Sequence, residues 1–116
     1  MVRVLIVSGA RRAGKSELLV DLVRTKNTNR NNQCVWFCLP GNRREDLDAH
    51  VVDDIRNWKR SETFEHCNVF FDEIFRFTEE QMIHVRQQLH ADDHVYISMT
   101  PDPNTSSDRL FDIFRG

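Results

Sequence analysis

The sequence predicts an α/β fold, a three-layer α/β/α sandwich built on a mostly parallel sheet. Four apolar runs of strand length alternate with segments whose apolar residues recur at helical spacing. Gly, Pro, Asn and Ser gather at the joints between these segments. Strands that alternate with helices form right-handed βαβ units, which place the strands parallel in one sheet. At 116 residues the chain has room for a single domain, residues 1–116.

The first strand is predicted at "VRVLIV" (residues 2–7), followed by a glycine-containing loop and a helix. One face of that helix carries Leu18, Leu19, Leu22 and Val23. The second strand, "CVWFCL" (residues 34–39), ends before a Pro-Gly pair. Asn42 and Glu45 then have the spacing of a capping box, which predicts a second helix. Its inward face would carry Leu47, Val51, Val52, Ile55 and Trp58.

The third strand is predicted at "NVFF" (residues 68–71), and Thr78 with Gln81 has capping-box spacing for a third helix. That helix carries Met82, Val85 and Leu89 on one face. The fourth strand, "HVYISM" (residues 94–99), precedes the breaker-rich stretch "TPDPNTSS". A short last helix carries Leu110, Phe111, Ile113 and Phe114. Three polar motifs then fall at the carboxyl edge of the sheet, where ligands bind in such folds.

Composition narrows the classes of function. The 40% hydrophobic and 29% charged content is that of an ordinary soluble globular protein. A net charge of −2 gives no global basic field, so the charge does not support nucleic-acid binding, although a local basic patch stays open. No apolar run approaches the roughly 20 residues of a membrane span, and the N-terminus does not resemble a signal peptide. The expected location is the cytoplasm or the nucleus, with no membrane partner.

The cysteines, histidines and phenylalanines are expected to be structural. The three cysteines lack CxxC spacing, which favours reduced, buried thiols; they are Cys34, Cys38 and Cys67. The five histidines show no metal-ligand spacing such as HExxH. Six phenylalanines have core-like spacings and are expected to pack inside the domain: Phe70, Phe71, Phe75, Phe77, Phe111 and Phe114.

The stretch "GARRAGKS", Gly9 to Ser16, satisfies the phosphate-loop pattern G-x-x-x-x-G-K-[ST] between a predicted strand and a predicted helix. Glycines let the backbone curl around phosphate oxygens, and amides at the start of the helix donate to them. Lys15 would neutralise the β- and γ-phosphates, and the Ser16 hydroxyl would complete a Mg²⁺ shell. The alternative is a simple glycine turn with a solvated lysine.

Nine residues are therefore candidates for binding a nucleotide: Gly9, Ala10, Arg11, Arg12, Ala13, Gly14, Lys15, Ser16 and Glu17. Arg11 and Arg12 are the ambiguous members of this set. They either contact phosphate or base or, as is usual for exposed loop arginines, are solvated.

Asp72 and Glu73 directly follow the third predicted strand, the arrangement called Walker B. Asp72 would hold the Mg²⁺ hydration shell, and Glu73 would orient and activate the water that attacks the γ-phosphate. An acidic pair that ends a strand is also common as turn chemistry. Its occurrence together with a phosphate loop favours the catalytic interpretation.

With these motifs the chain resembles the additional-strand, catalytic-glutamate division of P-loop ATPases, which contains AAA-type ATPases, superfamily 1 helicases and viral packaging motors. The resemblance spans nearly the whole chain, from "GARRAGKS" through "VFFDE" to "VYISMT". It implies that residues 94–99 form a sensor strand between the first and third predicted strands. It also implies that Thr100 contacts the γ-phosphate or the attacking water, with Ser98 and Asn104 as lesser candidates.

Within the division, "GARRAGKS" and "FFDEIFRF" resemble the G-x-R-x-x-G-K and D-E-I-x-R phrases of an AAA-type group of bacterial and archaeal ATPases. Superfamily 1 helicases are more distant, because they carry glutamine after the acidic pair where this chain has Ile74. Asn104 stands in the place of their phosphate-sensing glutamine. Thymidine kinases add a cysteine zinc ribbon, and this chain lacks its cysteines.

The resemblance also implies parts that the sequence does not supply: a fifth strand beside the first, a lid domain and an arginine finger. With four strands predicted, the first strand would be a bare sheet edge. The chain is thus expected to be an N-terminal fragment of a larger ATPase, or a minimal domain that a partner or homo-oligomer completes. Arg109 and Arg115 are candidate fingers, although arginines near a helix end are usually surface charges.

The sequence predicts Mg²⁺-dependent ATP binding and hydrolysis, with Glu73, Lys15 and Thr100 as catalytic residues and Ser16 and Asp72 as magnesium ligands. The absence of an N/TKxD-like guanine-reading motif favours ATP over GTP. Two alternatives stay open. One is a fragment of a nucleic-acid motor of the helicase or packaging type, and the other is a nucleotide-binding switch without turnover.

Overall fold

A computed structural model describes residues 2–10, 12–101 and 107–115 of the chain. The five strands are β1 (Arg3–Ser8), β2 (Asn32–Phe37), β3 (His50–Val52), β4 (His66–Phe71) and β5 (His94–Met99). The three α-helices are α1 (Lys15–Lys26), α2 (Glu79–Gln88) and α3 (Ser107–Arg115). Two short 3₁₀ turns, η1 (Ile55–Asn57) and η2 (Ile74–Arg76), follow β3 and β4.

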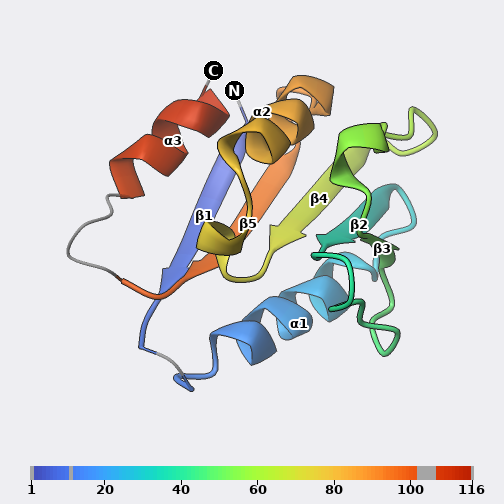
Figure 1. Cartoon of the computed structure of the whole chain (residues 1–116). Helices are drawn as coiled ribbons and strands as arrows, with labels where there is room; N and C mark the ends of the chain where they lie inside the picture. Colours follow the sequence, from blue (N-terminus) through green and yellow to red (C-terminus); the bar gives the residue numbers. More distant parts are fainter. Residues whose placement is uncertain (1, 11, 102–106, 116) are drawn as a thin grey trace.

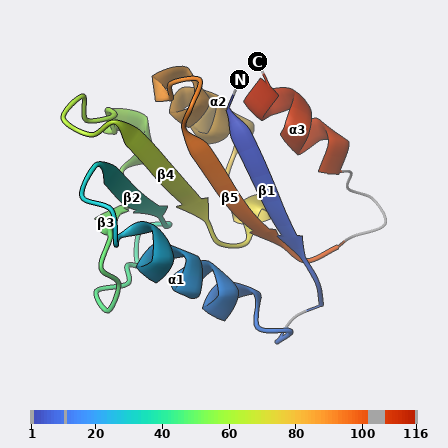
Figure 2. The same ribbon diagram turned by 180° about the vertical axis from the view of Figure 1, so that it is seen from behind.

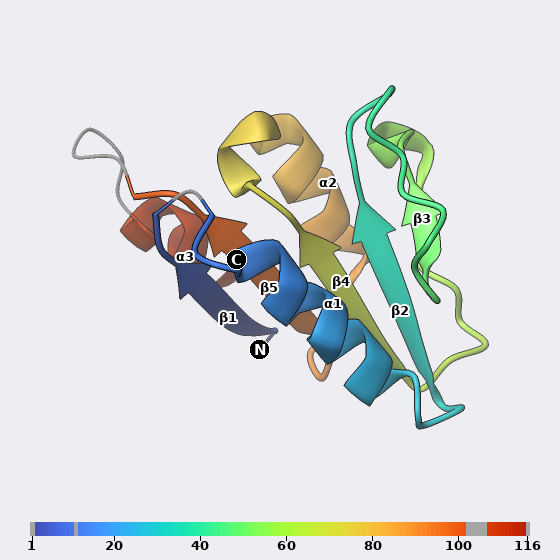
Figure 3. The same cartoon turned by 90° about the horizontal axis from the view of Figure 1, so that it is seen from below.

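All five strands pair in parallel, in the order β1-β5-β4-β2-β3. Helix α1 covers one face of the sheet, and α2 and α3 cover the other (Figures 1 and 3). The predicted α/β sandwich is therefore confirmed. Strand β5 lies between β1 and β4, which is the position expected for the fourth predicted strand.

The second predicted helix is wrong. After β2 the chain forms no α-helix but the short strand β3 and the turn η1. Val51 and Val52 are β-branched, and β3 pairs along β2 as far as the register Phe37 opposite Val52. Trp58 still reaches the core, where its ring meets Phe37 edge to face at 5.1 Å. Apolar spacing alone did not separate a helix from a strand followed by a turn.

The predicted count of four strands is consequently also wrong, because β3 is a fifth. It extends the sheet beyond β2, whereas the family resemblance implied a further strand beside the first one. Among the described residues β1 remains an edge strand, opposite the short edge β3 (Figure 2). The Leu5 side chain on β1 is 47% exposed, so this edge carries apolar surface.

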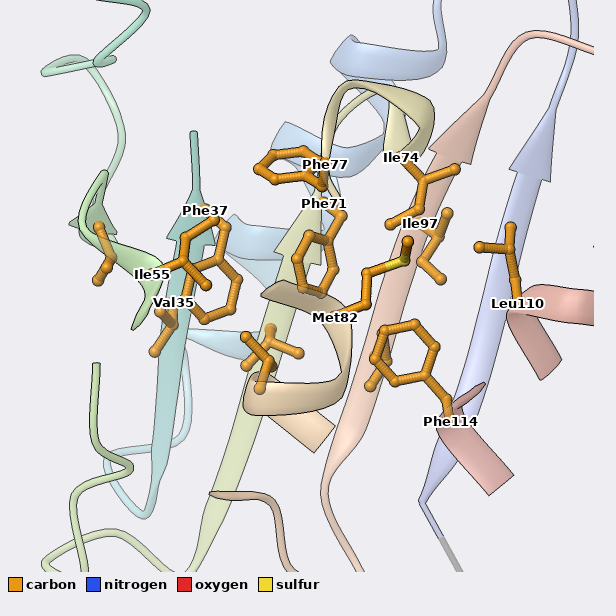
Figure 4. Packing of buried hydrophobic residues seen from close by; sticks show 14 of the residues in the cluster. Val35, Phe37, Ile55, Phe71, Ile74, Phe77, Met82, Ile97, Leu110 and Phe114 are labelled. Atoms are coloured by element: carbon orange, nitrogen blue, oxygen red, sulfur yellow. The ribbon is translucent and has the colours of Figure 1, made fainter. Parts of the chain in front are cut away.

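The core is divided by the sheet into two clusters. Figure 4 shows the larger one, in which Phe71 of β4 lies among side chains from α2 and α3. On the α1 face Phe70 stacks between Trp36 and Tyr96, with ring centroids 5.9 and 4.8 Å apart. Packing is confirmed for most of the phenylalanines, but Phe75 is 42% exposed and Phe111 is half-buried.

The cysteines behave as the sequence predicts. Cys34, Cys38 and Cys67 are free and buried. Burial raises the pKa of Cys34 to about 11 and that of Cys67 to about 12, with nearby carboxylates adding to the effect. The capping box of Thr78 and Gln81 at the start of α2 is also confirmed. None of the described helices is long and apolar enough to cross a membrane.

A buried ion pair closes the amino edge of the sheet. The Arg60 guanidinium donates to both oxygens of Asp93, at 2.6 and 2.9 Å, and the two side chains are almost fully buried. Asp93 also accepts from the backbone amides of Cys67 and His90. Burial by itself raises the pKa of Asp93, but these hydrogen bonds and the Arg60 charge lower it below the ordinary value.

The substitution Asp93→Asn should destabilise the fold by about 3 kcal/mol, because it leaves the buried Arg60 charge uncompensated. Since the folded pKa of Asp93 is depressed, its contribution is present above the unfolded pKa and is lost as pH falls below about 4. Urea unfolding across this pH range should show a steeper acid loss in wild type than in the variant. The exposed neighbour offers the control, because Asp92→Asn should change neither quantity.

Candidate active site

The residues singled out by the sequence gather at the carboxyl edge of three adjacent strands. Ser8 of β1 lies opposite Met99 of β5, and Phe71 of β4 lies opposite Ile97. In Figure 1 the arrowheads of these strands meet at one edge of the sheet, and the loop into α1 leaves from the same edge. The side chains that follow the strand ends therefore face one another.

The loop from Gly9 to Ser16 turns tightly before α1. The Gly9 amide donates to the Met99 carbonyl at 3.2 Å, and the Ala13 amide donates to Ala10 at 3.2 Å. Gly14 has φ +83°, a left-handed conformation that glycine adopts without strain. Gly14 is also the N-cap of α1, which has no side-chain cap. The first amides of α1 therefore lack a side-chain acceptor, as in helix ends that bind anions.

The nine loop residues differ in exposure. Ala10, Arg12, Ala13, Gly14 and Glu17 are exposed, Gly9 and Ser16 are half-buried, and Lys15 is 7% exposed. Arg12 adopts φ +63°, which the sequence did not indicate. Arg11 lies outside the described residues.

The Lys15 ammonium is held by groups at the ends of three strands, β1, β5 and β4. Its Nζ donates to the Thr100 hydroxyl at 2.7 Å, to the Met99 carbonyl at 3.2 Å and to the Gly9 carbonyl. It also forms an ion pair with Glu73 Oε1 at 3.2 Å. The long-range contacts of Lys15 thus join α1 to β5 and to the residue that follows Asp72.

Glu73 completes this group. Its carboxylate accepts from Thr100 Oγ1 at 3.0 and 3.2 Å. Partial burial by itself raises the pKa of Glu73, but the hydrogen bonds from Lys15 and Thr100 and the charges of Lys15 and Arg76 lower it below the ordinary value. Glu73 is therefore held as a carboxylate in this state.

Glu73 also has a strained backbone, with φ +56° and ψ +74°. A non-glycine residue in this left-handed region costs on the order of 1–3 kcal/mol, and such residues cluster at functional sites. No pattern in the sequence predicts it. The conformation allows the chain to leave β4 and enter η2 while the carboxylate turns towards Lys15.

Asp72 is linked to the start of α1. Ser16 Oγ lies 2.9 Å from both carboxylate oxygens of Asp72 and donates to them. Ser98 Oγ donates to Asp72 Oδ1 at 2.7 Å and accepts from the Glu73 amide at 2.8 Å. The fully buried Ser98 therefore fixes both acidic residues, a positioning contact that differs from the sensor role weighed for it in the sequence.

Ser16 and Asp72 supply the kind of donors that Mg²⁺ prefers. A hydroxyl and a carboxylate are hard oxygen ligands, and Mg²⁺ usually takes only one or two protein ligands and keeps several waters or phosphate oxygens. Their mutual contact means that one ion can reach both. Among the described residues no group of three or more His, Cys, Asp or Glu side chains is placed to hold a metal ion.

The other candidates lie away from this group or outside the described residues. Arg109 forms an ion pair with Glu79 at the start of α2, and its side chain is 71% exposed. Asn104 is outside the described residues, and so is the side chain of Arg115. The sequence thus found the residues that the structure joins, and the arginine finger stays a prediction.

A five-stranded parallel sheet with this loop and acidic pair at its carboxyl edge defines an α/β domain of the P-loop NTPase kind. The family model for the AAA domain matches residues 2–108, and the chain belongs to this family. Membership indicates a nucleotide-binding ATPase domain. Comparisons with curated proteins and with solved structures gave no match.

Ser98→Ala should destabilise the domain by about 1–3 kcal/mol, because it leaves the Glu73 amide without its acceptor and removes one of the two hydroxyl donors to Asp72 Oδ1. Urea unfolding of the variant measures the loss. Ser8→Ala removes an exposed serine at the end of the neighbouring strand and serves as the control. Equal stability of the two variants would contradict the positioning role of Ser98.

Proposed function

We propose that this AAA domain binds Mg²⁺-ATP at the carboxyl edge of β1, β5 and β4 and hydrolyses it by in-line attack of water. The observation that carries the proposal is one connected set of polar contacts: Ser16 to Asp72, Asp72 to Ser98, Ser98 to the Glu73 amide, and Lys15 to Thr100 and Glu73. These contacts join α1 to the ends of β4 and β5, and they gather the side chains to which we assign the hydrolysis of ATP.

Binding would begin at the loop before α1. The uncapped amides at the helix start and the helix dipole favour the phosphates, and Gly14 supplies the left-handed turn that aims these amides. Lys15 would move its hydrogen bonds from protein oxygens to the β- and γ-phosphates. A bound Mg²⁺ would neutralise phosphate charge, held through Ser16 and Asp72.

Glu73 is the group proposed to take the proton. Water attacks the γ-phosphorus, the bond to the β–γ bridging oxygen breaks, and ADP leaves with that electron pair. The Glu73 carboxylate accepts the proton of the attacking water and later passes it to phosphate or solvent. Thr100, already hydrogen-bonded to Glu73, would orient the carboxylate and the water.

The ion pair between Lys15 and Glu73 must give way for this step. While the ammonium neutralises the carboxylate, Glu73 is a weak base, as its lowered pKa indicates. A γ-phosphate that draws Lys15 away would release Glu73 and restore its basicity. Base activation would thereby depend on occupancy of the loop, which limits unproductive chemistry in the empty site.

We also propose that residues 1–116 act as one nucleotide-binding domain whose β1 edge pairs with another strand, supplied by a longer chain or a second copy. The support is the unpaired outer side of β1 among the described residues and the exposed Leu5 beside it. ATP is preferred over GTP because the sequence carries no guanine-reading motif.

Two substitutions separate binding from turnover. Lys15→Ala should weaken Mg²⁺-ATP affinity by about tenfold or more, because it removes the phosphate-neutralising charge. Glu73→Gln should leave affinity within about twofold and lower phosphate release by about a hundredfold or more, because the amide cannot accept the proton. Calorimetric titration measures the affinity, and a single-turnover phosphate assay measures the chemical step.

Exposed residues of the same types supply the matched controls: Lys59→Ala and Glu45→Gln should match wild type in both assays. Binding through Lys15 with no phosphate release in wild type would favour the nucleotide switch. Hydrolysis that requires DNA or RNA would favour the nucleic-acid motor. Unaltered affinity in Lys15→Ala would refute the proposed site.

The pH dependence of hydrolysis tests the role of Glu73 directly. Because the base must be ionised, the rate should fall as pH drops through its pKa, and kcat/KM reports the free protein. Thr100→Val removes one of the hydrogen bonds that lower the pKa of Glu73, so the acid limb of kcat/KM should move to higher pH. Steady-state rates between acidic and neutral pH measure the shift.

In the nucleotide complex Lys15 no longer neutralises Glu73, so the acid limb of kcat should lie above that of kcat/KM in wild type. The exposed Thr63→Val is the control and should leave both limbs in place. Coincident limbs in wild type and Thr100→Val would argue against Glu73 as the base.

A further inference from the structure

A second polar cavity lies at the opposite edge of the sheet, where the strands begin. Its volume is about 250 Å³, and it is lined by residues from the starts of β1, β2, β4 and β5 together with Lys26 at the end of α1. In Figure 2 these strands begin at the upper edge, whereas the loop into α1 lies at the lower edge. The six residues of β1 separate the two sites by roughly 20 Å.

The sheet register brings three polar side chains into one row of this cavity. Arg3 of β1 lies opposite His94 of β5, and His94 lies opposite Asn68 of β4. Paired residues of a sheet point to the same face, here the α1 face. Further along the same strands this face carries apolar rings such as Phe70 and Tyr96, so the polar row departs from the core pattern.

The strongest sign of a ligand is the Asn68 side chain. It is 2% exposed and lines the cavity, yet its Nδ2 has no hydrogen-bond partner. The buried Oδ1 of the neighbouring Asn32 also has none, but as an acceptor it needs a donor and is not itself a contact for an anion. Buried amide groups are nearly always satisfied, so an unpartnered donor that lines a cavity indicates an acceptor supplied from outside.

The charges around the cavity favour an anion. Arg3 and Lys26 are cations, His66 and His94 add two imidazoles, and Asp92 is the single carboxylate among the lining residues. Burial first, and then the charges of Lys26, Arg3 and His66, lower the pKa of His94. The cations therefore repel protonation of His94, and a bound anion would remove that repulsion.

We propose that this cavity is a second ligand site that takes the phosphate group of a small molecule or free inorganic phosphate. Donors approach from four separate elements, β1, α1, β4 and β5, which suits tetrahedral phosphate oxygens better than a planar carboxylate. A phosphate carries roughly two negative charges at neutral pH, close to the combined charge of Arg3 and Lys26. The cavity is smaller than pockets for drug-sized ligands, which start at about 300 Å³, so the ligand is smaller than a nucleotide.

The test uses the full chain in a Lys15→Ala background, which weakens binding at the loop before α1, and it reads a residue at the opposite edge of the sheet. Failure of the ATPase proposal therefore leaves this test intact. Inorganic phosphate, glycerol 3-phosphate and succinate are titrated separately. The readout is the imidazole NMR signal of His94, assigned with His94→Gln. We expect phosphate or its ester to shift this signal saturably, and succinate to bind more weakly.

Three variants assign the contacts. Arg3→Gln and Lys26→Gln should each raise the phosphate Kd by about tenfold, the factor that corresponds to about 1.4 kcal/mol. Asn68→Leu should also weaken binding while the thermal midpoint stays at least as high, because the buried Nδ2 had no partner to lose. Lys59→Gln, an exposed lysine changed in the same way, should have no effect. If Asn68→Leu does not fold, the two charge variants still decide.

The relative affinities for the three ligands decide between the possible occupants of the cavity. Tighter binding of glycerol 3-phosphate than of inorganic phosphate supports the site and identifies a small phosphorylated molecule, and the reverse order supports free phosphate. An unchanged His94 signal at saturating phosphate overturns the proposal. The proposal is also overturned if Arg3→Gln and Lys26→Gln bind phosphate with the same Kd as the control Lys59→Gln. Tighter binding of succinate than of either phosphate compound overturns the assignment to phosphate.

Discussion

The constraint on which the rest of the structure depends is the register of β5 between β1 and β4. With Ser8 opposite Met99, β1 and β5 end at the same level, and Gly9 and Thr100 follow side by side. With Phe71 opposite Ile97, β4 ends two residues earlier, which places Asp72 beside Ser98. A shift of β5 by one residue would turn Ser98 to the other face and break its contacts with the acidic pair. Successive residues of β4 and β5 alternate between the two core clusters, with Phe70 and Tyr96 in one and Phe71 and Ile97 in the other. A one-residue shift of β5 would exchange its residues between the clusters, so the packing of the core also sets the geometry of the site.

The second constraint is the burial of the Lys15 ammonium. A nearly buried ammonium is costly unless it is fully hydrogen-bonded, and Lys15 meets the need with two backbone carbonyls, a hydroxyl and the Glu73 carboxylate. The same contacts draw Glu73 into a left-handed backbone that only strong local interactions can hold. The Lys15 charge is thus compensated by contacts that hold Glu73 in a strained backbone conformation, and under the proposed function a phosphate would compete with Glu73 for the ammonium.

The sequence predicts the fold class and the grouping of these side chains, but not every element of the sheet. The phosphate-loop and Walker B patterns select Lys15, Ser16, Asp72 and Glu73, strand periodicity places them at one edge, and the structure brings them together there. The segment from Asn42 to Trp58 is misread because its apolar residues satisfy helical spacing, while the unpaired edge of β2 decides in favour of β3. The positive φ of Glu73 and the bridging role of Ser98 are invisible in the sequence, because both arise from contacts between strands distant along the chain.

Charged groups gather at both edges of the sheet, but their contacts differ. At the carboxyl edge the charged groups satisfy one another only through contacts that a ligand can exchange. At the amino edge the buried pair of Arg60 and Asp93 is fixed by backbone amides. One of these amides is that of Cys67, which precedes Asn68 in the chain. His94 directly follows Asp93. The amide of Arg3 donates to the carbonyl of Asp93 as well. The row of Arg3, His94 and Asn68 is therefore held in place by an ion pair that takes no part in it, so the proposed site would be positioned by the fold itself.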